Sequence, residues 1–100
     1  MDKETNDALR AKIPYILPPD VLVITRGIAA LGPKAVADIL LEVKEFSDFN
    51  EDNDPWNEHD FGSFFYESQE PREKIFWKID DYNGQEGYNL VLTVMLAEEY

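Results

Sequence analysis

The segment from Asn50 to Gly62 (N-E-D-N-D-P-W-N-E-H-D-F-G) contains the only histidine of the chain, His59, among five carboxylates. A histidine titrates near neutral pH, and a neighbouring carboxylate can make it a general base. The chain has no cysteine to activate, and its serines lie in no nucleophile-elbow pattern. His59 is therefore a secondary catalytic candidate, and the favoured interpretation is that its hydrogen bonds hold the loop in place.

The carboxylates of this segment are also possible metal ligands. Calcium and magnesium prefer oxygen donors of this kind, which here are Asp52, Asp54, Glu58 and Asp60. Their spacing differs from that of an EF-hand loop, and one histidine without cysteine disfavours structural zinc. We therefore expect no metal and no cofactor, and keep the four carboxylates as secondary candidates only.

Turn chemistry explains the middle of the segment. Asp and Asn side chains bond to their own backbone, and Pro55 presets a turn. We expect Trp56 to pin the loop onto the core, since a fully exposed tryptophan is unusual, and Gly62 to let the chain enter a sheet. The segment is then a rigid platform that holds its acids in fixed positions.

The charge balance of the whole chain indicates what kind of partner it attracts. It has 21 acidic and 9 basic residues, a formal net charge of -12. Such a surface repels nucleic acid and anionic membranes and attracts basic protein surfaces. The first ten residues contain no apolar signal region, and the apolar runs are too short to span a membrane. We expect a cytoplasmic protein.

Hydrophobic periodicity predicts the elements that position these residues. The pattern favours a helix at 3–12, a Pro-rich linker at 13–20, a strand at 21–25, a helix from Pro33 to about Phe46, and strands at 61–67 and 74–80. In the last of these, alternation places Trp77 on one face with Ile75 and Ile79. The segment 90–97 fits a strand or a buried helix, and its length favours a strand. The Pro33 helix carries an acidic stripe of Asp38, Glu42 and Glu45.

The predicted fold class is α+β, with two helices packed on one face of a small, mainly antiparallel sheet of about four strands. One hundred residues make a single domain, in which residues 1–20 are an N-terminal helix and linker and residues 21–100 are the helix-sheet core.

Several motifs resemble a known bacterial family, the domain of unknown function 3768. They are N-D-A-L-R (6–10), T-R-G-I-A-A-L-G (25–32), F-x-D-F-x-x-D-N-D-P-W-x-E-H-D-F-G (46–62), I-F-W-K-I-D-D-Y (75–82) and V-L-T-V-M-L-A-E-E-Y (91–100). Members of the family carry a longer acidic, Pro-rich insert where this chain has N-G-Q-E-G. The resemblance implies a bacterial, often plasmid- or phage-borne, setting and no particular reaction.

Three functions follow from these patterns. The first, which we favour, is an acidic protein-interaction module that inhibits a partner by docking on its basic nucleic-acid-binding surface, as a DNA mimic of anti-restriction or anti-CRISPR type. The partner-binding residues would be Asp38, Glu42, Glu45, Asp48, Glu51, Asp52, Asp54, Glu58 and Asp60. The second is a small His/carboxylate or metal-dependent hydrolase centred on His59. The third is a structural oligomerisation module with an exposed patch of Phe64, Tyr66 and Phe76.

Overall fold

A computed structural model describes residues 2–100. The elements in chain order are α1 (Lys3–Ala11), β1 (Val21–Ile24), α2 (Arg26–Ala29), α3 (Pro33–Glu45), β2 (Phe61–Tyr66), β3 (Glu73–Asp81) and β4 (Leu90–Leu96), with short 3-10 turns at Gln85–Gly87 and Ala97–Glu99. No helix within residues 2–100 has the length and apolar character that crossing a bilayer requires.

The four strands form one sheet in the order β1-β4-β3-β2. Its β2–β3 and β3–β4 pairs are antiparallel, whereas β1 runs parallel to β4. The predicted α+β class with a mainly antiparallel four-stranded sheet is thus confirmed. There are three helices rather than two, because the four residues of α2 are too few to show a helical period in the sequence.

Segment 90–97 is a strand, as its length predicted. β4 lies between β1 and β3, and its residues Leu92, Val94 and Leu96 stand opposite Ile79, Trp77 and Ile75. All six side chains are buried. Because alternate residues of a strand point to the same side, this register gathers these six side chains on the helix-covered face.

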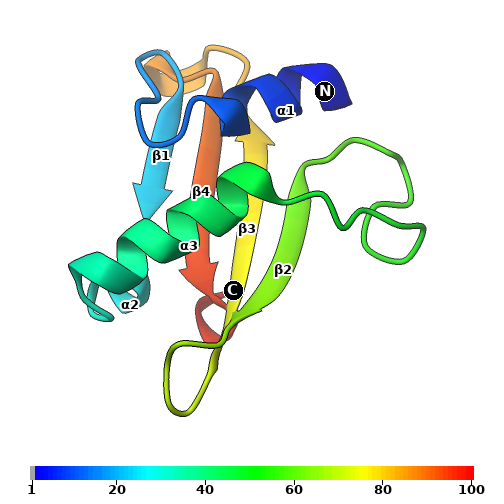
Figure 1. The fold of residues 1–100 in the computed structure, drawn as a ribbon. Coiled ribbons are helices and arrows are strands. Elements are labelled where there is room, and N and C mark those ends of the chain that lie inside the picture. The colour runs from blue at the N-terminus through cyan, green and yellow to red at the C-terminus, as the bar shows by residue number, and fades with distance from the viewer. Residues whose placement is uncertain (1) are drawn as a thin grey trace.

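Helix α3 covers that face and crosses in front of the sheet (Figure 1). Ile39 and Val43 of α3 are fully buried, as are Trp77 of β3 and Leu9 of α1. Pro33 starts the helix at a position where its missing N–H is not needed. The side of α3 that its hydrophobic periodicity makes apolar is therefore the side that packs on the sheet.

The opposite face of the sheet carries a smaller aromatic group. The rings of Phe61, Phe76 and Tyr100 meet edge to face at 5.4–6.2 Å. The predicted oligomerisation patch is not formed: Tyr66 is buried, and Phe64 stands opposite Ile75 on the core face, whereas Phe76 points the other way. Neighbouring residues of a strand cannot share a face, so Ile75 and Phe76 are separated by the sheet itself.

Gly62 is required by the closest packing in the sheet. It stands opposite Trp77 in the β2–β3 register, and a Cβ at this position would lie 2.7–2.8 Å from the indole carbons. The indole is fully buried and cannot move aside. The glycine that the sequence places at the start of the strand therefore makes room for a core tryptophan.

We predict that Gly62→Ala lowers the free energy of unfolding by about 1–3 kcal/mol, because the added methyl overpacks the site against Trp77. Ser63→Ala is the matched control in the same strand, with a side chain on the other face and an expected change within about 0.5 kcal/mol. Urea unfolding of both variants measures the difference, and equal stability would show that the indole has room to shift.

Candidate functional site

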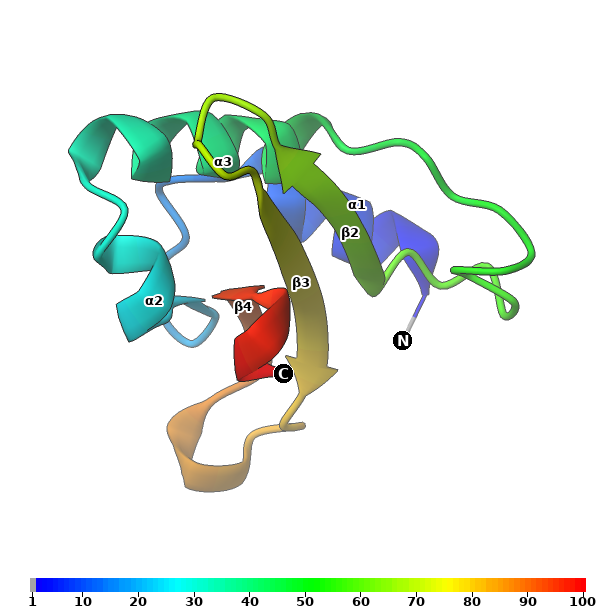
Figure 2. The same ribbon diagram turned by 90° about the horizontal axis from the view of Figure 1, so that it is seen from below.

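The loop between α3 and β2 projects beyond the sheet (Figures 1 and 2). Its first half is shaped by two asparagines. Asn50 Oδ1 accepts hydrogen bonds from the backbone N–H groups of Asp52 and Asn53, and Asn53 Nδ2 donates to the Asp48 carbonyl at 2.6 Å. These bonds are the side-chain turn chemistry expected of Asn in a loop.

A second turn follows at Asp54–Asn57, closed by the bond from the Asn57 N–H to the Asp54 carbonyl at 3.0 Å. Pro55 occupies the second position of this turn, as predicted. Trp56 occupies the third and is 81% exposed, so the expectation that it pins the loop to the core is wrong. The turn geometry directs Trp56 away from the body of the protein.

Asp54, rather than Trp56, anchors this part of the loop. It is 9% exposed, and its carboxylate accepts hydrogen bonds from the backbone N–H groups of Glu58 and His59. Asn57 and His59 both have positive φ angles, 53° and 55°. Side chains disfavour that conformation, and the bonds to Asp54 hold the chain in it. Asp54 therefore faces the interior, whereas the sequence had placed it among the partner-binding acids.

His59 is held on two sides. Its ring stacks on Phe49 at 3.8 Å with an interplanar angle of 4°, and Nδ1 lies 2.9 Å from Asp7 Oδ1. An ionised carboxylate can only accept, so Nδ1 carries the proton in this bond. Nε2 lies 3.7 Å from Asp54 Oδ2, beyond hydrogen-bond distance. The histidine thus joins the loop to α1.

Two further residues of α1 complete this junction. Asn6 Nδ2 donates to the Glu58 carbonyl at 2.9 Å. Arg10 Nη1 donates to the carbonyls of Val43 and Phe46 at 2.8 and 2.9 Å, and Nη2 donates to Asp7. We call Asn6, Asp7, Arg10 and His59 the polar junction; it binds α1 to the end of α3 and to the loop.

Arg10 is the central member of the polar junction. Its residue is 4% exposed, and its guanidinium lies over the rings of Trp77 and Phe49 at 4.9 and 5.4 Å. The last carbonyls of a helix lack partners within the helix, and a cation is favoured at that end. Arg10 supplies both the hydrogen bonds and the charge for the end of α3.

The polar junction also sets the ionisation of Asp7. Partial burial alone would raise the pKa of its carboxyl, but hydrogen bonds from His59 and Arg10, together with their charges, hold that pKa below its ordinary value. Asp7 therefore remains ionised and keeps both hydrogen bonds through the neutral range.

The contacts of the polar junction link the loop to α1 and do not arrange His59 as a catalytic base. Nδ1 of His59 is bonded to Asp7, one ring face is covered by Phe49, and no hydroxyl group of residues 2–100 bonds to the ring. His59 lines neither the apolar nor the acidic hollows beside α3. In the same part of the chain, no three His or carboxylate side chains converge as metal ligands would. The acids at 52, 54, 58 and 60 therefore do not form one ligand set.

The acids of α3 form a separate site beside β2. Glu42, Glu45 and Asp48 line a groove of about 540 Å³ with Phe46, Ser63, Phe64 and Phe65. We call it the acidic groove. It adjoins a second hollow lined in part by Asp38, Glu42, Phe65 and Glu67. The predicted stripe on α3 is thus continuous with Asp48 and acquires Glu67 from the end of β2.

Cations compensate only part of this site. Lys34 pairs with Asp38 at 2.7 Å, Tyr66 also donates to Asp38, and Arg72 pairs with Glu67. Glu42, Glu45 and Asp48 form no ion pair within residues 2–100. Desolvation raises the pKa of Glu42, and the charges of Asp38 and Glu67 raise it further. Glu42 is therefore repelled by the charges of Asp38 and Glu67.

The loop acids occupy other positions. Glu51 and Asp52 are exposed in the first turn, whereas Glu58 and Asp60 are half-buried near β2. Burial raises the pKa of Asp60, with the neighbouring charge of Glu58 as the next cause. The nine predicted partner-binding acids are therefore divided between the groove, the outer turn and the base of the loop.

A family described as "Protein of unknown function (DUF3768)" matches residues 24–99. The chain belongs to this family. Neither the curated proteins nor the solved structures gave a significant match. The matched region of this DUF3768 chain contains α3, the loop and the β2–β4 hairpins but not α1, so Asn6, Asp7 and Arg10 of the polar junction lie outside it.

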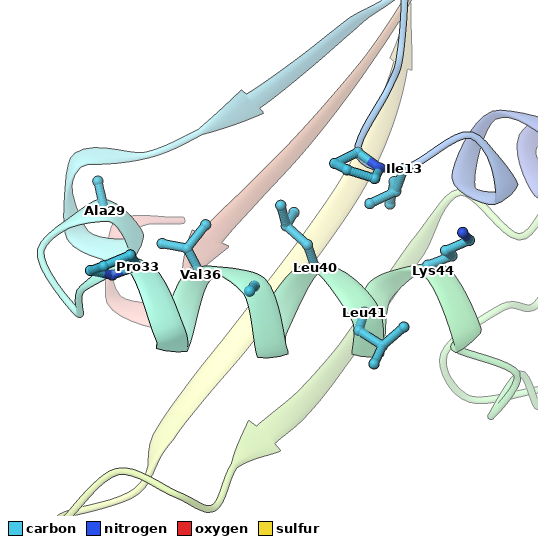
Figure 3. Close-up of a pocket in the computed structure, with 9 residues that line it drawn as sticks. Ile13, Ala29, Pro33, Val36, Leu40, Leu41 and Lys44 are labelled. Atoms are coloured by element: carbon cyan, nitrogen blue, oxygen red, sulfur yellow. The ribbon is translucent and has the colours of Figure 1, made fainter.

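The DUF3768 chain also has an apolar groove that the sequence did not reveal. It measures about 710 Å³ and is lined by Ile13, Pro14, Ala29, Pro33, Val36, Ala37, Leu40, Leu41 and Lys44. Figure 3 shows Val36 and Leu40 on the side of α3 that faces Ile13 and Ala29, with Leu41 on the other side. Leu41 lines both this groove and the hollow beside Asp38, so it separates the apolar side of α3 from its acidic side.

Sequence reasoning also missed Asn6, Asp7, Arg10 and Phe49. One signal was available: Asn6 and Arg10 are four residues apart and lie beside Leu9, so they share the side of α1 that faces the core. Two polar residues on the buried side of an amphipathic helix indicate that they bind another part of the chain.

We predict that Arg10→Lys lowers the free energy of unfolding by roughly 2–4 kcal/mol. A lysine lacks the planar fork that reaches two carbonyls and Asp7 together, so buried acceptors lose their donors. Arg26→Lys, an exposed arginine in no ion pair within residues 2–100, is the control and should change stability by less than about 0.5 kcal/mol. Urea unfolding monitors both, and equal effects would contradict a central role for Arg10.

The lowered pKa of Asp7 predicts a pH-dependent contribution to stability. A carboxylate whose folded pKa is depressed stabilises the fold above its ordinary pKa of 3.8, and this contribution is lost as the pH falls through the folded pKa. Asp7→Asn should cost on the order of 1 kcal/mol at pH 7, after allowance for solvent screening, and the difference from wild type should shrink toward pH 3.

Unfolding by urea at several pH values measures this difference. Asp52→Asn is the matched control, because it removes the same charge from an exposed side chain that accepts no hydrogen bond within residues 2–100. A gap between wild type and Asp7→Asn that stays constant from pH 7 to pH 3 would contradict the assignment.

Proposed function

We propose that this protein is an acidic interaction module that binds a basic surface of a partner protein. The observation that carries the proposal is the acidic groove, where Glu42, Glu45 and Asp48 line one hollow without an ion-pair partner in residues 2–100. More specifically, this partner surface binds nucleic acid, so that the module acts as an inhibitor of anti-restriction or anti-CRISPR type.

The electrostatics of the groove favour a cationic partner. Burial and the charges of Asp38 and Glu67 disfavour the ionised form of Glu42 in the free protein, as its raised pKa indicates. A lysine or arginine placed in the groove would replace repulsion by attraction. Glu42 thus gains more from a partner cation than an isolated surface carboxylate would.

The frame around the groove favours binding as well. Arg10 caps α3 next to Glu45, and the Asn53 bond to the Asp48 carbonyl fixes the chain that follows. Carboxylates on a prearranged backbone lose less conformational entropy on binding than carboxylates on a mobile chain. The polar junction therefore contributes to recognition without contacting the partner.

A nucleic-acid-binding partner fits the charge of the whole molecule. Surfaces that bind phosphates present clustered Lys and Arg, and these groups associate with anionic partners in a strongly salt-dependent way. The net charge of -12 also keeps the module itself away from nucleic acid. It would compete with nucleic acid for the same basic surface.

We predict that Glu42→Lys/Glu45→Lys abolishes capture of the partner from a bacterial lysate, because two attractive charges become repulsive. Glu86→Lys/Glu98→Lys is the matched control: both of these residues are exposed, and both double variants change the net charge from -12 to -8, since each substitution adds two charges. Capture by wild type and by the control should weaken steeply as salt rises, and duplex DNA should displace the captured partner.

Equal loss of capture in the two double variants would mean that net charge, and not the groove, determines binding. Capture that survives both high salt and Glu42→Lys/Glu45→Lys would contradict the proposal. Displacement by neither DNA nor RNA would refute the inhibitor form while leaving acidic docking in place.

A further inference from the structure

The open edge of the sheet runs beside the acidic groove. Strand β2 is the last in the order β1-β4-β3-β2, so it pairs with β3 alone. Asp60 accepts a backbone hydrogen bond from Ile79 at 2.8 Å. Asp60 and Ile79 are therefore a hydrogen-bonded pair, and in the β2–β3 register every second residue from Asp60 onward is hydrogen-bonded to β3. Every second residue in such a ladder directs both backbone groups away from its neighbour. In β2 these residues are Phe61, Ser63 and Phe65.

Nothing in residues 2–100 occupies that row of backbone groups. No backbone or side-chain hydrogen bond outside the β2–β3 pair involves the N–H or C=O groups of Phe61, Ser63 or Phe65. Ser63 and Phe65 line the acidic groove, so the row is open where the carboxylates of α3 are nearest.

The edge lacks the usual protection against pairing with another chain. Exposed edge strands normally carry a charge or a proline, or are very short. The six residues of β2, F-G-S-F-F-Y, contain neither, whereas the other edge strand, β1, has only four residues. A second copy of this chain is a poor partner, because antiparallel pairing of two β2 strands would bring two acidic grooves together.

From these observations we infer that the β2 edge binds an extended basic segment of the partner as a fifth strand. This inference rests on the proposed function and specifies its mode. Side chains of an added strand alternate between the two faces of the sheet. Those on the α3 side would meet Glu42, Glu45 and Asp48, and those on the other side would lie next to Phe61 and Phe65. The segment therefore alternates Lys or Arg with apolar residues.

A capped six-residue peptide of alternating lysine and valine, equal in length to β2, tests the inference. Two matched peptides carry N-methyl groups on either the valines or the lysines, with the same charge and composition. In antiparallel addition the valines stand opposite Phe61, Ser63 and Phe65 and donate to them, so methylated valines should weaken binding by about tenfold or more. Methylated lysines, whose N–H groups point away, should bind like the parent peptide.

Backbone amide exchange gives a residue-level measurement. The N–H groups of Phe61, Ser63 and Phe65 should become protected when the parent peptide binds, whereas those of Gly62 and Phe64 are already paired with β3 and should not change. Electrostatic docking without strand pairing would not produce this alternation.

Each outcome separates the two proposals. Equal affinity for all three peptides, no binding of any peptide, or protection of the β2 amides by self-association at high protein concentration would overturn strand addition. Wild-type affinity of Glu42→Lys/Glu45→Lys for the parent peptide would overturn the proposed function. Loss of affinity in that variant, with Glu86→Lys/Glu98→Lys unchanged and the valine-methylated peptide weak, would support both.

Discussion

The buried guanidinium of Arg10 is the interaction on which the rest of the structure depends. It gives the end of α3 the hydrogen bonds that the helix lacks, pairs with Asp7, and lies on the indole of Trp77. A buried charge is stable only when its partners are in place, so these contacts form or fail together. The end of α3, the start of the loop and the position of α1 are thereby set by one side chain.

The acids of this protein serve two different purposes. Asp7 and Asp54 accept hydrogen bonds that hold the loop, whereas Glu42, Glu45 and Asp48 face an open groove without ion-pair partners in residues 2–100. The first group stabilises the fold, whereas Glu42 of the second group is destabilised by burial and by the charges of Asp38 and Glu67. A surface that retains such a cost is consistent with a role in binding, because the partner is what removes it.

The sequence predicted the elements well where periodicity was strong. The hydrophobic periodicity of α3 and the alternation in β3 specify which side chains are buried, and both are confirmed. It failed in the loop, where Trp56 is exposed and Asp54 is buried. No period exists in a turn, so residue type alone had to decide which side chain points inward. Here Asp54 points inward because its carboxylate accepts the backbone N–H groups of Glu58 and His59, and the turn leaves Trp56 exposed.

By itself, the sequence determined the α+β class, the Asn- and Pro-based turns of the loop, the excess of negative charge and membership of a family. Each of these follows from composition or local pattern, which the linear chain contains. Only the tertiary structure decided that Asp7 and Arg10 meet His59 and the end of α3, and that β2 is an open edge beside Glu42 and Glu45. Contacts between distant segments depend on how helices pack and strands order, and no local pattern encodes either.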